Sequence, residues 1–358
     1  MSSYLINGNG KVFLTEGIKK VIREAKTYIK ACNFLFQDKD IIQLLKEAAK
    51  RGVAIFIISN IRLQDYQEDS AGNNYGNDTT LPNLNDLKLL GCHVHLLKEL
   101  HAKFIISDGE QGIIMSANFA SNSINKNTET GVFVYEKELE DLEYVFEKLY
   151  LSSDITDIDR NEYRNILSKH VNYVKLDVTQ HLKSGTKYTI RSTKADNNLY
   201  HSNVKTIYDS ILEIIKGSKQ YLYIVTWHFK AIKELPGFLY EIKNAIKRGV
   251  KVVLYSNMYG SSPSLKTSIE EINKLKSLGC VVYGDDNNHS KCILSEKDGI
   301  LFTANIDGKQ GLLNGFEVGI KLTNEQRTIA DNHIKDLVQA SKDRKLNNKQ
   351  KDKYGRNK

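Results

Sequence analysis

Two short segments of the sequence place a lysine two residues after a histidine, and similar text follows both. The first is His101-Ala-Lys103 and the second is His289-Ser-Lys291. An imidazole can act as a nucleophile or as a general acid and base near neutral pH. A neighbouring lysine can hold a phosphate oxygen through its charge. This combination is suited to a reaction at a phosphate group.

The residues that follow distinguish these two segments from two other occurrences of the pattern, His181-Leu-Lys183 and His228-Phe-Lys230. An acidic residue stands seven positions after each motif histidine, and a hydroxyl residue and an asparagine come later. These residues are Asp108, Ser116 and Asn118 in the first copy, and Glu296, Thr303 and Asn305 in the second. The second copy is one residue shorter between its two apolar runs, where a hairpin turn tolerates a deletion.

The repetition extends upstream of the motifs and predicts a duplicated domain. Residues 50–53 and 247–250 both read Lys-Arg-Gly-Val, and Leu-Gly-Cys recurs at 90–92 and 278–280. The offset between the copies falls from 247 − 50 = 197 to 278 − 90 = 188. The first half therefore carries nine extra residues, which we place in the polar stretch 64–81 as a surface loop.

Apolar periodicity predicts the same order of elements in both halves: helix, strand, helix, strand. The expected ranges are 18–29, 28–36, 41–50 and 54–59 in the first half, and 204–215, 221–229, 239–247 and 251–256 in the second. Thr15 is a possible cap of the first helix. Together with the strands of the motifs, this order indicates an α/β sandwich with helices on the faces of a mixed sheet.

We place the domains at residues 1–151 and 195–340. Residues 152–194 have no counterpart and are expected to form a connector; its predicted elements are a helix at 162–167 and strands at 171–178 and 187–192. Residues 341–358 contain eight Lys and Arg against two Asp, so this tail carries 8 − 2 = +6 of the net charge of +8. With almost no apolar residue, the tail is predicted to be flexible or to tether a polyanion.

Composition bounds the remaining possibilities. A chain of 358 residues with 41% hydrophobic residues is sufficient for two cores, and no apolar run approaches the ~20 residues needed to span a bilayer. We therefore expect a soluble, cytoplasmic protein. The four cysteines stand singly in apolar segments, which indicates reduced, buried thiols. They are Cys32, Cys92, Cys280 and Cys292. No metal-ligand pattern is visible, and neither a metal nor a cofactor is expected.

The paired motifs resemble the phospholipase D superfamily, whose motif is His-x-Lys, four residues, Asp, six residues and Gly-Ser-x-Asn, present twice. Residues 101–118 match it with Met115 in place of glycine. In the second copy, glutamate replaces the aspartate, threonine replaces the serine, and one residue is missing. Acidic residues further on, Glu129 and Glu317, also fit. The resemblance implies a duplicated phospholipase D-like α/β sandwich with two mixed sheets, a pseudo-twofold axis and one shared active site that needs no partner subunit.

The resemblance also implies a metal-independent mechanism with a phosphohistidine intermediate. We assign His101 as the nucleophile and His289 as the acid and base, although the sequence does not order them. Residues expected to hold the non-bridging oxygens are Lys103, Lys291, Asn118 and Asn305. Supporting roles are expected for Asp108, Glu296, Ser116 and Thr303, and a place at the edge of the site for Glu129 and Glu317. Trp227 and His228 are either core or site lining, and His228-Phe-Lys230 is expected outside the paired geometry.

Three functions remain open on the sequence alone. A nuclease acting on DNA or RNA fits a compact chain whose cationic tail would bind phosphates by counterion release. A phospholipase D or phosphatidyltransferase would use the tail on an anionic membrane surface, with Leu312, Leu313 and Phe316 as a lipid-facing lip. A polyanion-binding protein with a decayed second motif would be non-catalytic. We favour the nuclease.

Overall fold

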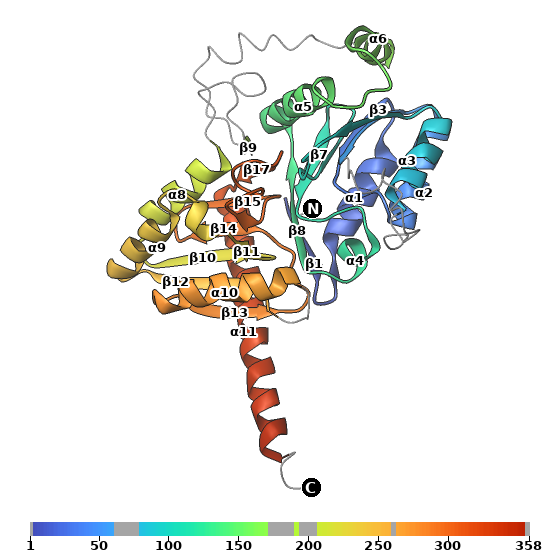
Figure 1. Cartoon of the computed structure of the whole chain (residues 1–358). Helices are drawn as coiled ribbons and strands as arrows, with labels where there is room; N and C mark the ends of the chain where they lie inside the picture. Colours follow the sequence, from blue (N-terminus) through green and yellow to red (C-terminus); the bar gives the residue numbers. More distant parts are fainter. Residues whose placement is uncertain (1–2, 61–78, 171–189, 193–205, 259–262, 355–358) are drawn as a thin grey trace, which may run out of the picture. The chain divides into compact units, whose positions relative to one another are not determined.

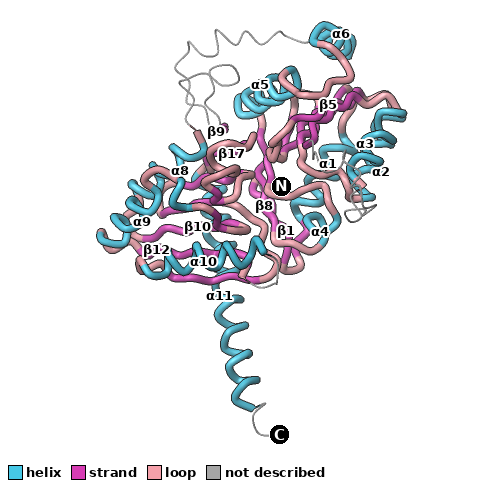
Figure 2. The backbone as a smooth tube through the Cα atoms, in the orientation of Figure 1, coloured by secondary structure: helices cyan, strands magenta, loops and turns pink. Residues whose placement is uncertain are grey.

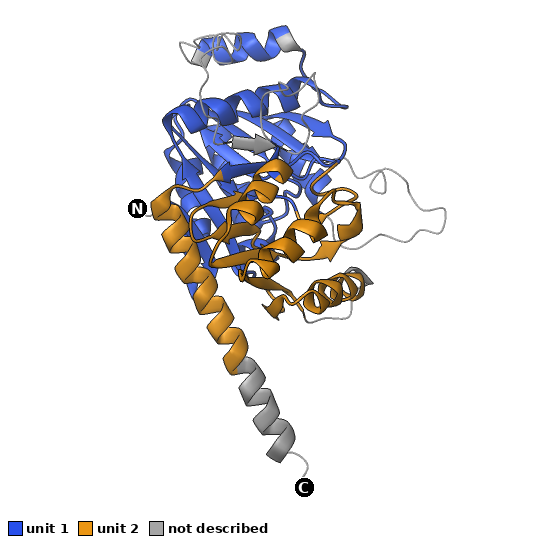
Figure 3. Cartoon of the chain, turned by 90° about the vertical axis from the view of Figure 1, so that its left-hand side faces the viewer, with its two compact units in different colours: residues 1–207, 302–304, 314–320 blue, residues 208–301, 305–313, 321–358 orange. Residues whose placement is uncertain are grey.

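The computed structural model describes residues 3–60, 79–170, 190–192, 206–258 and 263–354 (Figure 1). The predicted loop at 64–81 and strand at 187–192 lie only partly within these ranges, and the predicted strand at 171–178 lies outside them. So do His181 and the last residues of the tail. The chain divides into two compact units (Figure 3). Unit 1 comprises residues 1–207, 302–304 and 314–320, and unit 2 comprises residues 208–301, 305–313 and 321–358.

This division differs from the predicted domain boundaries in one respect that matters for function. Two short segments of the second sequence copy, 302–304 and 314–320, belong to unit 1. Backbone hydrogen bonds explain the placement of the longer segment. The carbonyl of Phe316 accepts from the N–H groups of His101 (2.9 Å) and Ala102 (2.7 Å), and the N–H of Phe316 donates to Glu99 (3.0 Å).

Unit 1 contains a mixed sheet in the order β2-β1-β8-β7-β6-β3-β4-β5. Its strands are β1 (Tyr4–Gly8), β2 (Lys11–Val12), β3 (Tyr28–Cys32), β4 (Ala54–Asn60), β5 (His93–Leu97), β6 (Phe104–Ser107), β7 (Gln111–Met115) and β8 (Glu129–Val134). Strands β3, β4 and β5 are parallel, and the other neighbours are antiparallel. Unit 1 also holds the antiparallel pair of β9 (Ile190–Ser192) and β17 (Val318–Lys321).

Helices cover both faces of this sheet (Figures 1 and 2). On one face lie α1 (Phe13–Glu24), α2 (Lys39–Lys50) and α3 (Thr80–Leu89); on the other lie α5 (Glu136–Leu151) and α6 (Arg160–His170), and the short α4 (Ser121–Asn125) contacts β1. Successive residues of β3 serve both layers, because a strand alternates its side chains. Ile29 and Ala31 join the apolar core with α1 and α2, whereas the buried Lys30 pairs with Glu143 of α5.

Apolar periodicity predicted the buried face of α1 correctly but not the end of the helix. Leu14, Ile18, Val21 and Ile22 are fully buried at helical spacing and form the face that packs on the sheet. The helix nevertheless ends at Glu24, so the predicted extent to residue 29 was too long. The predicted cap was also wrong. Thr15 lies inside the helix, where its hydroxyl donates to the carbonyl of Ile124 (2.8 Å).

Unit 2 repeats the core of unit 1. Its strands follow the order β13-β12-β10-β14-β15, which corresponds to β5-β4-β3-β6-β7. The strands are β10 (Tyr221–Thr226), β12 (Lys251–Asn257), β13 (Val281–Asp285), β14 (Cys292–Ser295) and β15 (Gly299–Phe302), and β11 (Phe229–Lys230) pairs separately with β16 (Ile306–Asp307). As in unit 1, the central pairs β10–β12 and β12–β13 are parallel, and β10–β14 and β14–β15 are antiparallel. The predicted duplication and the mixed α/β class are confirmed.

Helices again lie on both faces of the strands of unit 2 (Figures 2 and 3). They are α8 (Ile207–Gly217), α9 (Phe238–Lys247) and α10 (Pro263–Ser277) on one face, with the short 3-10 helix at Ile232–Glu234, and α11 (Asn324–Tyr354) on the other. Within α11, Ala330, Ile334, Leu337 and Ser341 are buried at helical spacing. The Ser341 hydroxyl donates to the carbonyl of Gly284 (3.0 Å). The predicted tail boundary at residue 341 therefore falls inside a helix that packs on β13.

Two expectations from composition can be compared with the described residues. All four cysteines are buried and unpaired, as predicted. Burial raises the pKa of Cys92, Cys280 and Cys292 to about 12, so these thiols are poor nucleophiles. In the parts of the chain that the structure describes, we find no helix with the length and apolar character needed to span a membrane.

Candidate active site

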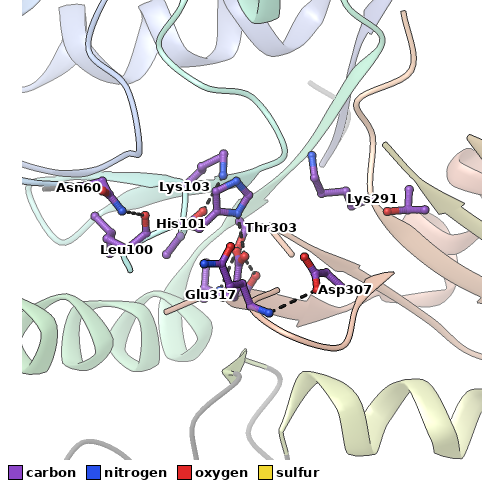
Figure 4. A network of polar contacts seen from close by, with 12 residues as sticks. Asn60, Leu100, His101, Lys103, Lys291, Thr303, Asp307 and Glu317 are labelled. Carbon is purple, nitrogen blue, oxygen red and sulfur yellow. Dashed lines mark hydrogen bonds and ion pairs between the residues drawn. The ribbon is translucent and has the colours of Figure 1, made fainter. Parts of the chain in front are cut away.

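A buried carboxylate of the second sequence copy holds the histidine of the first motif (Figure 4). In unit 1, Oε1 of Glu317 lies 2.7 Å from Nδ1 of His101, and Oε2 accepts a 2.5 Å hydrogen bond from the hydroxyl of Thr303. Glu317 is 2% exposed, whereas the His101 side chain is 25% exposed. Because an ionised carboxylate can only accept, Nδ1 carries the proton.

The charge of Glu317 is maintained by its neighbours. Burial alone raises the pKa of a carboxyl group. Here the interaction with His101 and the further contributions of Lys103 and Thr303 outweigh burial and hold the pKa of Glu317 below its usual value. The carboxylate is therefore ionised at neutral pH, where it orients the imidazole and would stabilise a positive charge on it.

Side-chain hydrogen bonds also fix the backbone around His101. The Asn60 side chain, at the end of β4, donates to the carbonyl of Leu100 (2.7 Å). Lys103 is fully buried, and its ammonium donates to the carbonyl of His101 (2.6 Å). Phe34 meets the His101 ring edge to face at a centroid distance of 5.3 Å. The imidazole is thus positioned by backbone, carboxylate and aromatic contacts together.

Ser116 and Glu129 form the counterpart of the Thr303–Glu317 pair. The Ser116 hydroxyl donates to Oε2 of Glu129 at 2.5 Å and accepts from the N–H of Thr130 at 3.0 Å. Glu129 is fully buried. In both copies the hydroxyl residue of the motif therefore supports the later glutamate. Glu129 and Glu317 were expected at the edge of the site. Both are buried, Glu129 as the first residue of β8 and Glu317 directly before β17.

In unit 2, the second motif has the same local form. Lys291 is fully buried, and its ammonium donates to the carbonyl of His289 (2.7 Å) and lies 3.2 Å from Nδ1 of that residue. Trp227 occupies the place that Phe34 has in unit 1, with its ring centroid 5.5 Å from that of His289. Each motif histidine is thus accompanied by its own lysine and its own aromatic ring.

The motif asparagines are held by residues that sequence reasoning missed. Asn33, fully buried after β3, donates to the carbonyl of Ala117 (3.2 Å) and accepts from the N–H of Phe119 (3.2 Å). These two groups flank Asn118. The amide oxygen of Asn118 is buried and has no hydrogen-bond partner among the described residues, as is also true of Asn305. In unit 2, Thr226 takes the role of Asn33, since its hydroxyl accepts from Ile306 (3.2 Å).

The acidic residues of the two motifs do not join these groups. Asp108 lies in the turn after β6, at the opposite end of that strand from His101. Its carboxylate accepts from the backbone N–H groups of Lys26, Thr27 and Tyr28 at 2.8 to 2.9 Å. At about 3.3 Å per residue, the strand separates Asp108 from Lys103 by roughly 15 Å. Asp108, which was expected to support the catalytic groups, instead fastens the turn to the start of β3.

Glu296, also expected in a supporting role, holds the corresponding turn in unit 2. Its carboxylate accepts from the N–H groups of Lys219 (2.9 Å) and Gln220 (3.3 Å), just before β10. Strand register explains the change from aspartate to glutamate. Ser107 pairs with Gln111 around a three-residue turn, whereas the 2.8 Å bond from Ser295 to Asp298 closes a two-residue turn. The longer side chain compensates for the shorter turn.

The described residues contain no group of three or more His, Cys, Asp and Glu side chains placed to hold a metal ion. The motif lysines, whose ammonium groups lie on the carbonyls of His101 and His289, suit an anion. An imidazole with an ionised partner, a fixed ammonium group and an amide are groups that suit reaction at a phosphodiester.

Comparison with known proteins agrees with this geometry. Residues 18–150 match the family model described as "Cardiolipin synthase, PLD-like domain". The first half of the chain is thus similar to a PLD-like domain, and the fold of the whole chain is that of a phospholipase D-like protein. The phosphatidylserine synthase of Haemophilus influenzae Rd KW20 has the same fold over 95% of this chain and 86% of its own, at 13% identity and a TM-score of 0.62.

Two further solved structures are similar to different shares of this chain. Polyphosphate kinase from Porphyromonas gingivalis aligns with 93% of this chain and 49% of its own, at 11% identity and a TM-score of 0.52. Nuc from Salmonella typhimurium, described as a phospholipase D family member, aligns with 40% of this chain and 91% of its own, at 24% identity and a TM-score of 0.34. No curated protein matches the chain.

Replacing Asn33 tests whether it positions the superfamily asparagine. Asn33→Leu removes the bonds on both sides of Asn118, and we expect kcat for a phosphodiester such as bis(4-nitrophenyl) phosphate to fall by about 10- to 100-fold, the equivalent of ~1–3 kcal/mol. Asn33→Thr introduces the residue that unit 2 uses at this place and should recover much of the loss. Equal rates in all three proteins would contradict the positioning role.

Removing Asp108 should weaken the fold rather than the chemistry. The pKa of Asp108 is lowered because its hydrogen bonds outweigh burial. Its contribution to stability is therefore present above the unfolded pKa, near 4, and is lost as pH falls through the lower folded value. We expect Asp108→Ala to cost about 1–2 kcal/mol at pH 7 in denaturant unfolding, and less at pH 3. Glu110→Ala, in the same turn, is the control and should be nearly neutral.

Proposed function

We propose that this chain is a metal-independent phosphodiesterase that cleaves nucleic acid through a phosphohistidine intermediate. The observation that carries the proposal is the buried Glu317 carboxylate on Nδ1 of His101, because a proton held on Nδ1 makes Nε2 the nitrogen that can act as the nucleophile. In the first step the Nε2 lone pair attacks phosphorus, and the bond from phosphorus to the leaving oxygen breaks. The imidazolium that forms is stabilised by the carboxylate beside it.

The second motif supplies the acid and base in this proposal. His289 would protonate the leaving oxygen, then take a proton from water, whose oxygen attacks phosphorus and releases His101. Lys103, Lys291, Asn118 and Asn305 would bind the non-bridging oxygens. Two observations support one site that draws on both sequence copies: the motifs are repeated with their supports, and Thr303 and Glu317 of the second copy complete the network of His101. By the same repeat, Glu129 would orient His289.

Nucleic acid is the proposed substrate because of where the charge lies. Residues 344–358 contain seven Lys and Arg and one Asp, so they carry 7 − 1 = +6 of the net +8. A polyanion with regularly spaced phosphates would engage such a segment and release counterions. The alternative of a phospholipid substrate relied on an apolar lip that included Leu312, but this side chain is 1% exposed.

The mechanism predicts that activity requires both motif histidines and survives chelation. His101→Ala and His289→Ala should each reduce cleavage by at least ~10²-fold, the lower range of what a positioned acid or base contributes. Labelled single-stranded DNA, duplex DNA, RNA and phosphatidylcholine vesicles should be tested in parallel, with and without EDTA. His181→Ala, in an occurrence of His-x-Lys without the later motif, is the control. Full activity of His289→Ala would remove the two-motif mechanism, and loss of activity in EDTA would indicate a metal enzyme.

Truncation after Asp343 tests the role of the basic segment while leaving the buried Ser341 in place. If all six charges contact phosphates of duplex DNA, the slope of log affinity against log salt should decrease by about 0.9 × 6, or roughly 5. Turnover at saturating substrate should change little, because the removed segment contains no candidate catalytic group. An unchanged salt slope would show that other parts of the chain bind the substrate charge.

A further inference from the structure

The two copies differ beside their motifs, and the difference is confined to a few positions. The bridge between Phe36 and Phe119 in unit 1 corresponds to the pairing of Phe229 with Ile306 in unit 2. This register makes Leu35, Gln37 and Ala120 of unit 1 the counterparts of His228, Lys230 and Asp307 of unit 2. In the second copy a histidine therefore replaces a leucine, a lysine replaces a glutamine, and an aspartate replaces an alanine.

His228 is the least expected of the three, because the fold does not require it. Both of its ring nitrogens are buried and make no hydrogen bond of normal geometry with the described residues; the neighbouring carboxylate of Asp307 interacts with the ring and can serve only one nitrogen. A buried polar atom without a partner destabilises a protein. Leucine occupies the equivalent place in unit 1, so an apolar side chain is compatible with this backbone. A polar ring where leucine suffices, with a carboxylate that can serve only one of its two nitrogens, indicates a partner that the chain itself does not provide.

Asp307 is close to His228 but is already engaged elsewhere. It accepts from the backbone N–H of Lys309 at 2.7 Å, and one of its oxygens lies 3.7 Å from the ammonium of Lys230. Burial raises the pKa of Asp307, but the surrounding donors, with His228 and Lys230 among them, lower it overall. The carboxylate is thus ionised, and it limits the direction in which His228 can offer a nitrogen.

His228 shares the surroundings of the second motif. The hydroxyl of Thr226 donates to the carbonyl of His228 (3.1 Å) and accepts from the N–H that follows Asn305. The Trp227 ring centroid is 4.7 Å from that of His228 and 5.5 Å from that of His289. One short segment therefore brings His228 and a half-buried indole beside both the histidine and the asparagine of the motif in unit 2.

We propose that His228 is a specificity-determining residue that binds a sugar or phosphate oxygen of the nucleotide next to the reacting phosphate, with Trp227 as the surface on which its base stacks. The proposal rests on the proposed function and extends it. A neutral imidazole offers one donor and one acceptor, which suits a hydroxyl group. Stacking of a base on an aromatic side chain tolerates any sequence. The unit 2 motif then selects the substrate, while unit 1 has an apolar Leu35 at the same position.

The test compares two substrates in the full chain. An oligonucleotide has a neighbouring nucleotide, whereas bis(4-nitrophenyl) phosphate does not. We expect His228→Leu to reduce kcat/KM for the oligonucleotide by about 10-fold, the loss of one hydrogen bond, and to reduce that for the small diester by a much smaller factor. His228→Gln, which keeps a donor and an acceptor, should recover part of the loss. The Tm of His228→Leu should equal or exceed that of the wild type, because a buried unpaired group is removed.

Leu35→Ala is the matched control at the equivalent place in unit 1 and should affect both substrates by the same factor. If His228→Leu reduces kcat/KM for the oligonucleotide and for the small diester by the same factor, the proposal is overturned, since His228 would then support the reaction at phosphorus and not the choice of substrate. A lower Tm with unchanged kinetics would also overturn it and make His228 a core residue. If the wild type cleaves neither substrate, the proposed function fails. Oligonucleotide binding by fluorescence anisotropy then decides this proposal alone: weaker binding by His228→Leu supports it, and equal binding overturns it.

Discussion

The buried contact between Glu317 and His101 is the constraint on which the arrangement in unit 1 depends. A carboxylate that is 2% exposed remains ionised only if donors surround it, and here an imidazole and a threonine hydroxyl do so. This requirement explains why the segment 314–320, although it belongs to the second sequence copy, pairs with residues 99–102 within unit 1. The chain path, the tautomer of the histidine and its direction all follow from satisfying one buried charge.

Much of the fold was predictable because apolar periodicity and duplication are local signals. Spacing alone located α2 and α9, and the repeated motifs located the strands around both histidines. The end of α1 was not predictable in this way, because Ala25 and Ile29 continue the helical spacing while belonging to the turn and strand that follow. Tertiary pairing of β3 with β4 and β6 overrides that local preference.

The site was predictable in its residue types but not in its connections. Motif spacing singled out His101 and Lys103 as candidates, yet nothing in the sequence joins His101 to a glutamate 216 residues away. Asn33 was missed because a lone asparagine after an apolar strand has no spacing signal, and its partners are backbone groups on another strand. The distance of Asp108 from His101 was not predictable, because a motif records which residues occur together and not which end of a strand each occupies.

In the hairpin turns of the two copies, the length of the turn and the length of its acidic side chain change together. A three-residue turn with aspartate and a two-residue turn with glutamate reach the same backbone donors, so length and side chain form a single exchangeable unit. Transplanting either change alone would leave the carboxylate too far from those N–H groups or too close to them. A sequence comparison that scores the gap and the acidic substitution separately counts one structural event twice, and so makes the two halves look less related than their backbones are.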